Sequence, residues 1–205
     1  MRNRNLLLLL LVLLLAPALF ADTFTLHSLN VTLYNPANPN GGLAVQYAPS
    51  HQGDFTFTLN PGGQTTFDLF KIWTPEDAVN YPDDLIPQTI TADLIFTAPP
   101  TDANVSGETV GHLQGQFLCQ ITHKCPIQWG EVNWNGPVTF GDHDQFTVSL
   151  SDEIFNEGFL WGLDEGKCDG AIVKATVTYA QTPEPASLAL LGAGMLGMLG
   201  LRRKR

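Results

Sequence analysis

The chain has 205 residues, of which 44% are hydrophobic and 15% are charged, with 10 Lys and Arg residues against 20 Asp and Glu residues. This composition is too apolar for a disordered chain, and the acidic balance argues against nucleic-acid binding. Basic residues gather at the two ends, whereas residues 22–181 hold 19 acidic residues and four lysines and therefore a net charge of −15.

The N-terminal segment has the pattern of a secretory signal peptide. Arg2 and Arg4 form a basic start, and residues 6–15 are all leucine apart from one valine. Such a run suits the hydrophobic region of a signal and is too short to span a bilayer. We expect a signal peptide over residues 1–21, with cleavage by signal peptidase after Ala21, because polar, strand-like sequence begins at the next residue.

The middle segment, residues 22–181, alternates apolar and polar residues with the period of two that is typical of β-strands. Clear runs of this kind occur at 24–33, 55–59, 67–73, 90–96, 146–150 and 172–179. Residues that favour turns fall between apolar runs, at 35–36, 38–42, 60–63, 99–100 and 135–137. We expect one all-β ectodomain of about eight to twelve strands, an antiparallel β-sandwich of which a jelly roll is one form. One helical turn is expected at residues 74–77, where Thr precedes Pro.

The ectodomain contains three cysteines, Cys119, Cys125 and Cys168. Export would place them in an oxidising compartment, where disulfides persist. We favour a Cys119–Cys125 disulfide across a short loop, with a disulfide that uses Cys168 as the alternative. A zinc site made of the three cysteines and His123 is a further possibility, but its spacing is not that of a standard zinc finger. The other histidines, His27, His51, His112 and His143, are scattered, and we expect them to be solvated.

Acidic residues gather at three places where loops are predicted: Asp142 with Asp144, Asp152 with Glu153, and Asp164 and Glu165 with Asp169. Calcium takes about six to eight oxygen ligands, which loops at one end of a sandwich can supply. The first and third groups are therefore the candidate calcium ligands. The competing explanation is an acidic surface that keeps an exported protein soluble. We expect no cofactor, and calcium is the one metal for which the sequence offers an argument.

The C-terminal segment, residues 182–205, has three parts in order. Pro183, Glu184 and Pro185 break the chain, residues 186–201 carry no charge, and Arg202, Arg203, Lys204 and Arg205 end it. A helix of this apolar length rises about 24 Å, against ~30 Å for the hydrocarbon core of a bilayer. We expect a single short membrane helix whose basic end stays in the cytoplasm, so that the residues between the two ends lie outside it.

This order of parts, over residues 183–205, resembles the PEP-CTERM sorting signal of exported bacterial proteins. The resemblance implies recognition by an exosortase, a membrane transpeptidase-like enzyme, and processing near Pro183, Glu184 and Pro185. It also implies a precursor tethered in the inner membrane before it reaches the cell surface or the extracellular matrix. Proteins with this signal are associated with Gram-negative bacteria that make extracellular polysaccharide. The signal is attached to many unrelated domains, so it does not identify the ectodomain.

The sequence contains no nucleophile elbow, no zinc-protease motif and no P-loop. We therefore expect a structural or adhesive protein that associates with exopolysaccharide, and not an enzyme. The alternative is a secreted polysaccharide-active enzyme or a carbohydrate-binding module. A concave face with exposed tryptophans and two facing carboxylates would favour the alternative, whereas tryptophans buried in the core would favour the first reading. The tryptophans are Trp73, Trp129, Trp134 and Trp161.

Overall fold

The computed structural model describes residues 21–34, 41–115, 127–141, 145–159, 162–180 and 194. Asp22–Ala180 form one compact unit. Its described part contains eleven strands and two single turns of 3-10 helix. The strands are β1 Asp22–Tyr34, β2 Gln46–Pro49, β3 Phe55–Leu59, β4 Gln64–Trp73, β5 Gln88–Ala98, β6 Pro100–Gln114, β7 Ile127–Trp134, β8 Val138–Phe140, β9 Phe146–Leu150, β10 Glu153–Phe159 and β11 Ala171–Tyr179. The helical turns are η1 Asp83–Leu85 and η3 Lys167–Asp169.

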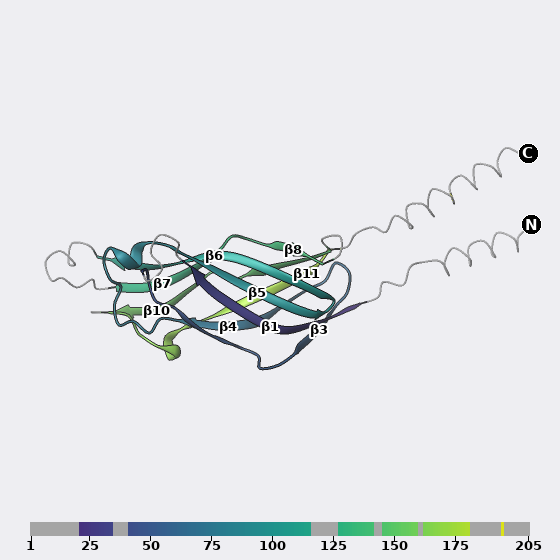
Figure 1. Ribbon diagram of the computed structural model, residues 1–205, viewed down its shortest axis with the longest axis horizontal. Helices are drawn as coiled ribbons and strands as arrows, with labels where there is room; N and C mark the ends of the chain where they lie inside the picture. The colour runs from purple at the N-terminus through teal and green to yellow at the C-terminus, as the bar shows by residue number, and fades with distance from the viewer. Residues whose placement is uncertain are drawn as a thin grey trace, which may run out of the picture. The chain divides into compact units, whose positions relative to one another are not determined.

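The strands form two antiparallel sheets (Figure 1). One sheet has the order β10-β7-β6-β5-β1-β3, and the other has the order β2-β4-β11-β9-β8. Strands β5, β6 and β7 form a meander in which each strand pairs with the next. The predicted all-β, antiparallel class and the predicted range of strand number are confirmed for the described residues.

The core lies between the inner faces of the two sheets. Ring contacts between buried side chains join one sheet to the other: Phe24 lies 4.7 Å from Phe146, Phe96 lies 5.3 Å from Phe140, and Phe70 lies 6.3 Å from Trp134, measured between ring centroids. All six side chains are buried. Large aromatic residues provide most apolar area per side chain, so these contacts are a main source of the free energy that holds the sheets together.

A β-bulge in β1 changes which side chains face outward. The pairing of β1 with β5 shifts between Thr25 and Leu26 and again between Leu26 and Ser28. As a result two consecutive exposed residues, His27 and Ser28, separate Leu26 from Leu29, which both pack in the core. Bulges of this kind redirect side chains at sheet edges, and here the redirected side chain is that of His27.

The connection from β4 to β5 corrects one prediction. The helical turn expected at residues 74–77 does not form, and the helical turn of this connection is η1. The local capping contact is present, because the Glu76 amide donates to Thr74 Oγ1 at 3.1 Å. Side chains from distant strands accept hydrogen bonds from the backbone amides on either side of this contact. Thr74 N donates to Asn156 Oδ1, and Val79 N donates to Gln128 Oε1. Tertiary hydrogen bonds therefore replace the helical ones.

Candidate functional site

Most of the site residues predicted from the sequence lie outside the described part of the chain. These are Cys119, Cys125, Asp142, Asp144, Pro183, Glu184, Pro185, Arg202, Arg203, Lys204 and Arg205. The disulfide and the processing site therefore stay predictions. Cys168 is described: it is a free, exposed cysteine in η3, and its carbonyl accepts a hydrogen bond from Lys71 Nζ at 3.1 Å.

The three described calcium candidates lie on the connection between β10 and β11. Asp164, Glu165 and Asp169 are all exposed. Within the described ranges, no three His, Cys, Asp or Glu side chains form a group that could hold a metal ion. The remaining candidates lie outside those ranges, so calcium binding stays a prediction. Glu153, from the other predicted loop cluster, is the first residue of β10.

The calcium hypothesis makes a measurable prediction. A ligand that binds only the folded chain stabilises it by ~2.7 kcal/mol at a hundredfold excess over its Kd. Replacing chelator with millimolar calcium should therefore raise the melting temperature of the full-length protein, as followed by circular dichroism. An equal rise with monovalent salt would mean charge screening alone, and no rise would contradict the hypothesis.

The side chains best arranged for binding surround a cavity of about 210 Å³ beside β1. The cavity lies where β1 meets the connection from β2 to β3, and it also touches β4. Its lining is mostly apolar and consists of Leu26, His27, Ser28, Leu29, Pro49, His51, Gly53, Phe55 and Leu69. Small-molecule sites typically combine an apolar lining with a few polar groups, and two imidazoles are the titratable groups here.

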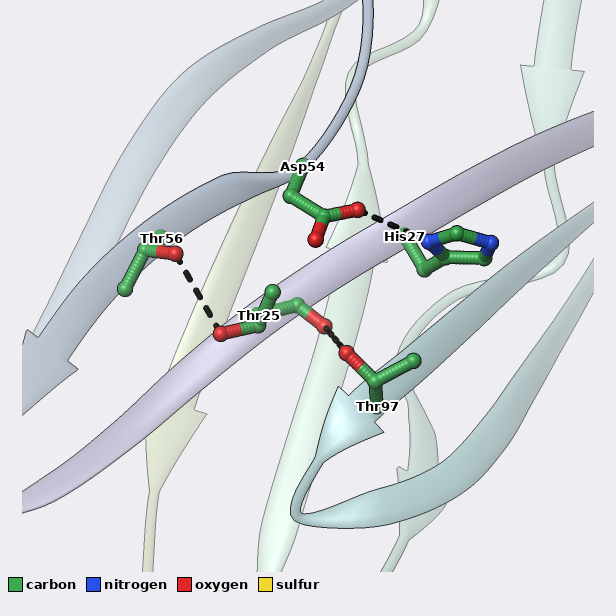
Figure 2. Close-up of polar contacts among 5 residues, drawn as sticks. All are labelled: Thr25, His27, Asp54, Thr56 and Thr97. Carbon is green, nitrogen blue, oxygen red and sulfur yellow. Dashed lines mark hydrogen bonds and ion pairs between the residues drawn. The ribbon is translucent and has the colours of Figure 1, made fainter.

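One of these imidazoles forms a hydrogen bond to a carboxylate at the surface (Figure 2). His27 Nδ1 lies 2.7 Å from Asp54 Oδ1, and the two side chains are 59% and 57% exposed. Asp54 directly precedes β3, and His27 stands on the bulge of β1, so the pairing of these strands brings the two residues together. A polar contact this exposed adds at most about 1 kcal/mol to stability.

Threonine side chains continue this polar surface across three strands (Figure 2). Thr25 Oγ1 of β1 lies 3.2 Å from Thr56 Oγ1 of β3. On the other side of β1, Thr97 Oγ1 of β5 donates to the Thr25 carbonyl at 3.4 Å. The outer face of the six-stranded sheet is thus lined by hydroxyl groups next to the His27–Asp54 pair.

The second imidazole of the cavity, that of His51, is mostly buried. Its ring stacks on Phe55, with centroids 4.1 Å apart and an interplanar angle of 15°. His51 Nε2 is inaccessible to solvent and has no hydrogen-bond partner among the described residues. This corrects the expectation that all the scattered histidines are solvated. A buried polar atom without a partner costs free energy.

His112 departs from the same expectation in a different place. Its ring stacks on Trp129 at 5.0 Å, and its Nε2 lies 2.6 Å from Glu131 Oε2. These residues face outward on β6 and β7, and none of them lines the cavity.

Two carboxyl groups, those of the buried Asp84 and the half-buried Glu76, lie in the connection from β4 to β5. Asp84 is 2% exposed, and its Oδ2 accepts from the Asn80 amide at 2.6 Å. Glu76 accepts from the Ala44 amide at 2.6 Å and from Asn80 Nδ2 at 2.9 Å. Burial, and then the neighbouring charge of Asp84, raise the pKa of Glu76 above its ordinary value, although its hydrogen bond from Ala44 acts in the opposite direction.

The raised pKa of Glu76 predicts a stability that falls as the pH rises. Between the ordinary value of 4.5 and the higher folded-state pKa, the folded chain binds more protons at this site than the unfolded chain. Stability from this group is therefore full below 4.5 and is lost as the pH rises through the folded pKa. We expect the free energy of unfolding of the wild type to fall relative to that of Glu76→Gln over this window, as measured by urea unfolding from pH 4 to pH 8. Parallel curves for the two proteins would contradict this assignment.

None of these residues was predicted from the sequence to belong to a site. His27 and Asp54 are separated by 27 positions, and Glu76 and Asp84 lie within a connection whose sequence has no regular period. The bulge in β1 and the pairing of β1 with β3 create the cavity. No local sequence pattern predicts the bulge or the strand pairing.

Comparison with known proteins identifies the C-terminal segment. Residues 181–205 match the PEP-CTERM protein-sorting motif, which confirms the resemblance read from the sequence. The motif implies export, a membrane-anchored precursor and processing by an exosortase. Neither a curated protein nor a solved structure was found that matches the chain. In the part of the chain that the structure describes, no helix is long and apolar enough to cross a membrane; the predicted membrane helix, residues 186–201, lies almost entirely outside that part.

Proposed function

We propose that this chain is exported, sorted by an exosortase and then retained at the cell surface or in the extracellular matrix, where its β-sandwich has a structural or adhesive role in contact with extracellular polysaccharide. The sorting motif at residues 181–205 is the observation that carries the proposal. It accounts for the C-terminal segment, and export would place the ectodomain outside the cell, where it can bind.

The outer face of the six-stranded sheet supports contact with a glycan. Besides the threonines of β1, β3 and β5, it carries a Ser106–Asn135 pair at 3.1 Å and an Asn104–Asp93 pair. Hydroxyl and amide groups both donate and accept hydrogen bonds, as sugar hydroxyls do. The described lysines, Lys71, Lys167 and Lys174, lie on the other sheet and on η3. This face therefore suits a neutral glycan better than a polyanion.

One observation supports a non-catalytic role. Trp134 packs in the core against Phe70, where it cannot stack on a sugar, whereas Trp129 faces outward on β7 and stacks on His112.

The glycan contact is tested by co-sedimentation of the full-length protein with the extracellular polysaccharide of the producing cells. Thr25→Val with Thr56→Val removes one cross-strand hydroxyl pair from the six-stranded sheet and keeps the side-chain shape. The matched control is Thr66→Val with Thr176→Val, because those hydroxyls form a similar pair at 2.8 Å on the five-stranded sheet. We expect only the first double variant to bind less. Equal binding by the wild type and both variants, or no binding by the wild type, would contradict the proposal.

A further inference from the structure

We propose that the free edge of β3 is a dimerisation site, at which β3 pairs antiparallel with β3 of a second copy of this chain. β3 ends the order of the six-stranded sheet and pairs with β1 alone among the described strands (Figure 1). Its other edge therefore presents backbone N–H and C=O groups that no described strand takes up. Such an edge is a template for pairing with another chain.

The other three edges of the two described sheets carry features that oppose pairing with a second chain. β10 contains Glu153 and Glu157, and a bulge after Phe155 breaks its pairing with β7. β2 has four residues and ends in Pro49, which has no N–H to donate, and β8 has three residues. Charges, bulges, proline and short strands are the usual ways in which proteins protect a sheet edge.

β3 has none of these protective features. Its five residues alternate phenylalanine and threonine and end in Leu59, without a charge, a proline or a shift in the pairing with β1. Phenylalanine and threonine both favour strands. Residues 22–181 carry a net charge of −15, so two copies repel each other over most of their surface. An uncharged edge is the place where they can meet.

The sequence of β3 is self-complementary in antiparallel pairing. When Phe57 of one copy lies opposite Phe57 of the other, Thr56 lies opposite the second copy's Thr58. In the same register Phe55 lies opposite the second copy's Leu59. Every apolar residue thus meets an apolar residue and every hydroxyl meets a hydroxyl, on the same two faces that they occupy in the single copy.

The charges next to β3 also agree with this register. Asp54, which directly precedes β3, lies opposite Asn60 of the second copy, and a side-chain amide can donate to a carboxylate. The two Asp54 carboxylates therefore lie at opposite ends of the joined edges. Because the same patch is used by both copies, the contact is isologous and closes as a dimer, whereas a head-to-tail contact would continue into a filament.

The second copy would also cover aromatic rings at this margin of the sandwich. Phe55 and Phe57 are half-buried, and their rings lie 4.8 and 5.3 Å from that of Phe67 on β4, measured between ring centroids. Directly opposite residues of paired strands have Cβ atoms about 4.5–5.5 Å apart, so the two Phe57 rings would contact each other. Burial of this apolar surface adds to the hydrogen bonds between the edges.

Dimerisation goes beyond the proposed contact with polysaccharide and does not depend on what the outer face binds. It would join the outer faces of two six-stranded sheets into one surface, with the Thr25–Thr56 hydroxyl pair of each copy close to the junction. A dimer would then present two copies of this face to one polymer, and such linked sites raise avidity without any new contact.

The test measures the mass of the full-length protein in detergent micelles by sedimentation equilibrium, after subtraction of the bound detergent. Thr56→Glu with Thr58→Glu introduces charges at two exposed positions, which lie opposite each other in the joined edges. Thr56→Lys with Thr58→Lys introduces the opposite charge at the same positions. The matched control is Thr66→Glu with Thr139→Glu, two exposed threonines of the five-stranded sheet, of which Thr66 also forms a hydroxyl pair with the next strand.

We expect the wild type and the control to be dimers of equal affinity. Each β3 variant alone should dimerise about tenfold more weakly or worse, because like charges directly opposite across paired strands are destabilising and each dimer would contain two such pairs. An equimolar mixture of the Glu and Lys variants should regain the dimer, which misfolded variants could not do. A monomeric wild type would overturn the proposal. A dimer that both β3 variants keep would overturn it too, because that dimer would form through another part of the chain, such as Cys168 or residues 186–201.

Discussion

Replacing Asn156 by Ala is expected to lower the free energy of unfolding by about 3–5 kcal/mol. Asn156 is fully buried in β10. Its side chain forms hydrogen bonds to two connections, the one between β4 and β5 and the one between β10 and β11. Its Oδ1 accepts from the Thr74 amide at 2.8 Å, while its Nδ2 donates to the carbonyls of Asp164 and Gly166. Alanine would leave one buried amide and two carbonyls without this partner, and each such group costs about 1–3 kcal/mol when it cannot reach water.

The backbone of Asn156 adds to the expected effect. Its φ is +53°, in the left-handed region that Asn tolerates better than Ala. Asn156→Gly removes the same hydrogen bonds without this backbone cost, so the difference between the two variants isolates it. Asn104→Ala is the control, because Asn104 is exposed on β6. Urea unfolding measures all three, and a loss below about 1 kcal/mol for Asn156→Ala would show that the loops do not depend on this residue.

The same substitution should loosen two segments before the sheets unfold. Gly166 N donates to the Thr74 carbonyl, and Leu163 N donates to the Asp77 carbonyl, both at 2.8 Å. Asn156 holds these two connections in register with each other. Hydrogen exchange at Leu163 and Gly166 should therefore accelerate in Asn156→Ala by more than the global loss of stability requires.

Strands with large apolar residues on one face were predictable from the sequence. The pattern at residues 55–59 and 146–150 coincides with β3 and β9, and that at 172–179 misses only the first residue of β11. In these strands every second residue enters the core, so alternation in the sequence reports burial directly.

Strands β6, β7 and β10 were not predicted, because small or polar residues occupy their inner faces. On β6 the inward positions include Gly107, Thr109 and Gly111. A Cβ at Gly107 would clash with the Asn133 carbonyl, and one at Gly130 of β7 would clash with the ring of Phe155. These glycines permit close packing inside the sheet, but glycine in a sequence pattern indicates a turn.

The candidate site escaped prediction for a different reason. Its polar groups belong to the β1 bulge and to the connection between β2 and β3, and strand pairing brings them together over a long sequence separation. The C-terminal motif, in contrast, is read as a linear segment, so its parts keep their order and spacing in the sequence. That difference explains why the sorting signal was recognised and the cavity was not.

Replacing Glu184 by Ala is expected to abolish processing, so that full-length precursor accumulates in the membrane. Proline disfavours helix at the residue before it, so the sequence predicts an extended backbone at Thr182 and Glu184, which precede Pro183 and Pro185. An extended segment beside a membrane is accessible to an enzyme that must read its side chains. The mature protein in wild-type cells should then end near residue 184 and lack residues 186–205.

The control for this prediction separates a sorting signal from a plain anchor. An anchor depends on its hydrophobicity and its flanking charges, so loss of one acidic side chain outside the apolar run would leave its behaviour unchanged. Glu157→Ala removes an exposed glutamate from β10 and should be processed normally. Mass spectrometry of the C-terminus, in cells with an active exosortase, decides between the two readings. Mature protein that still ends in Arg205, or Glu184→Ala that is cleaved like the wild type, would leave the plain anchor as the explanation, because neither result is compatible with an enzyme that reads Glu184.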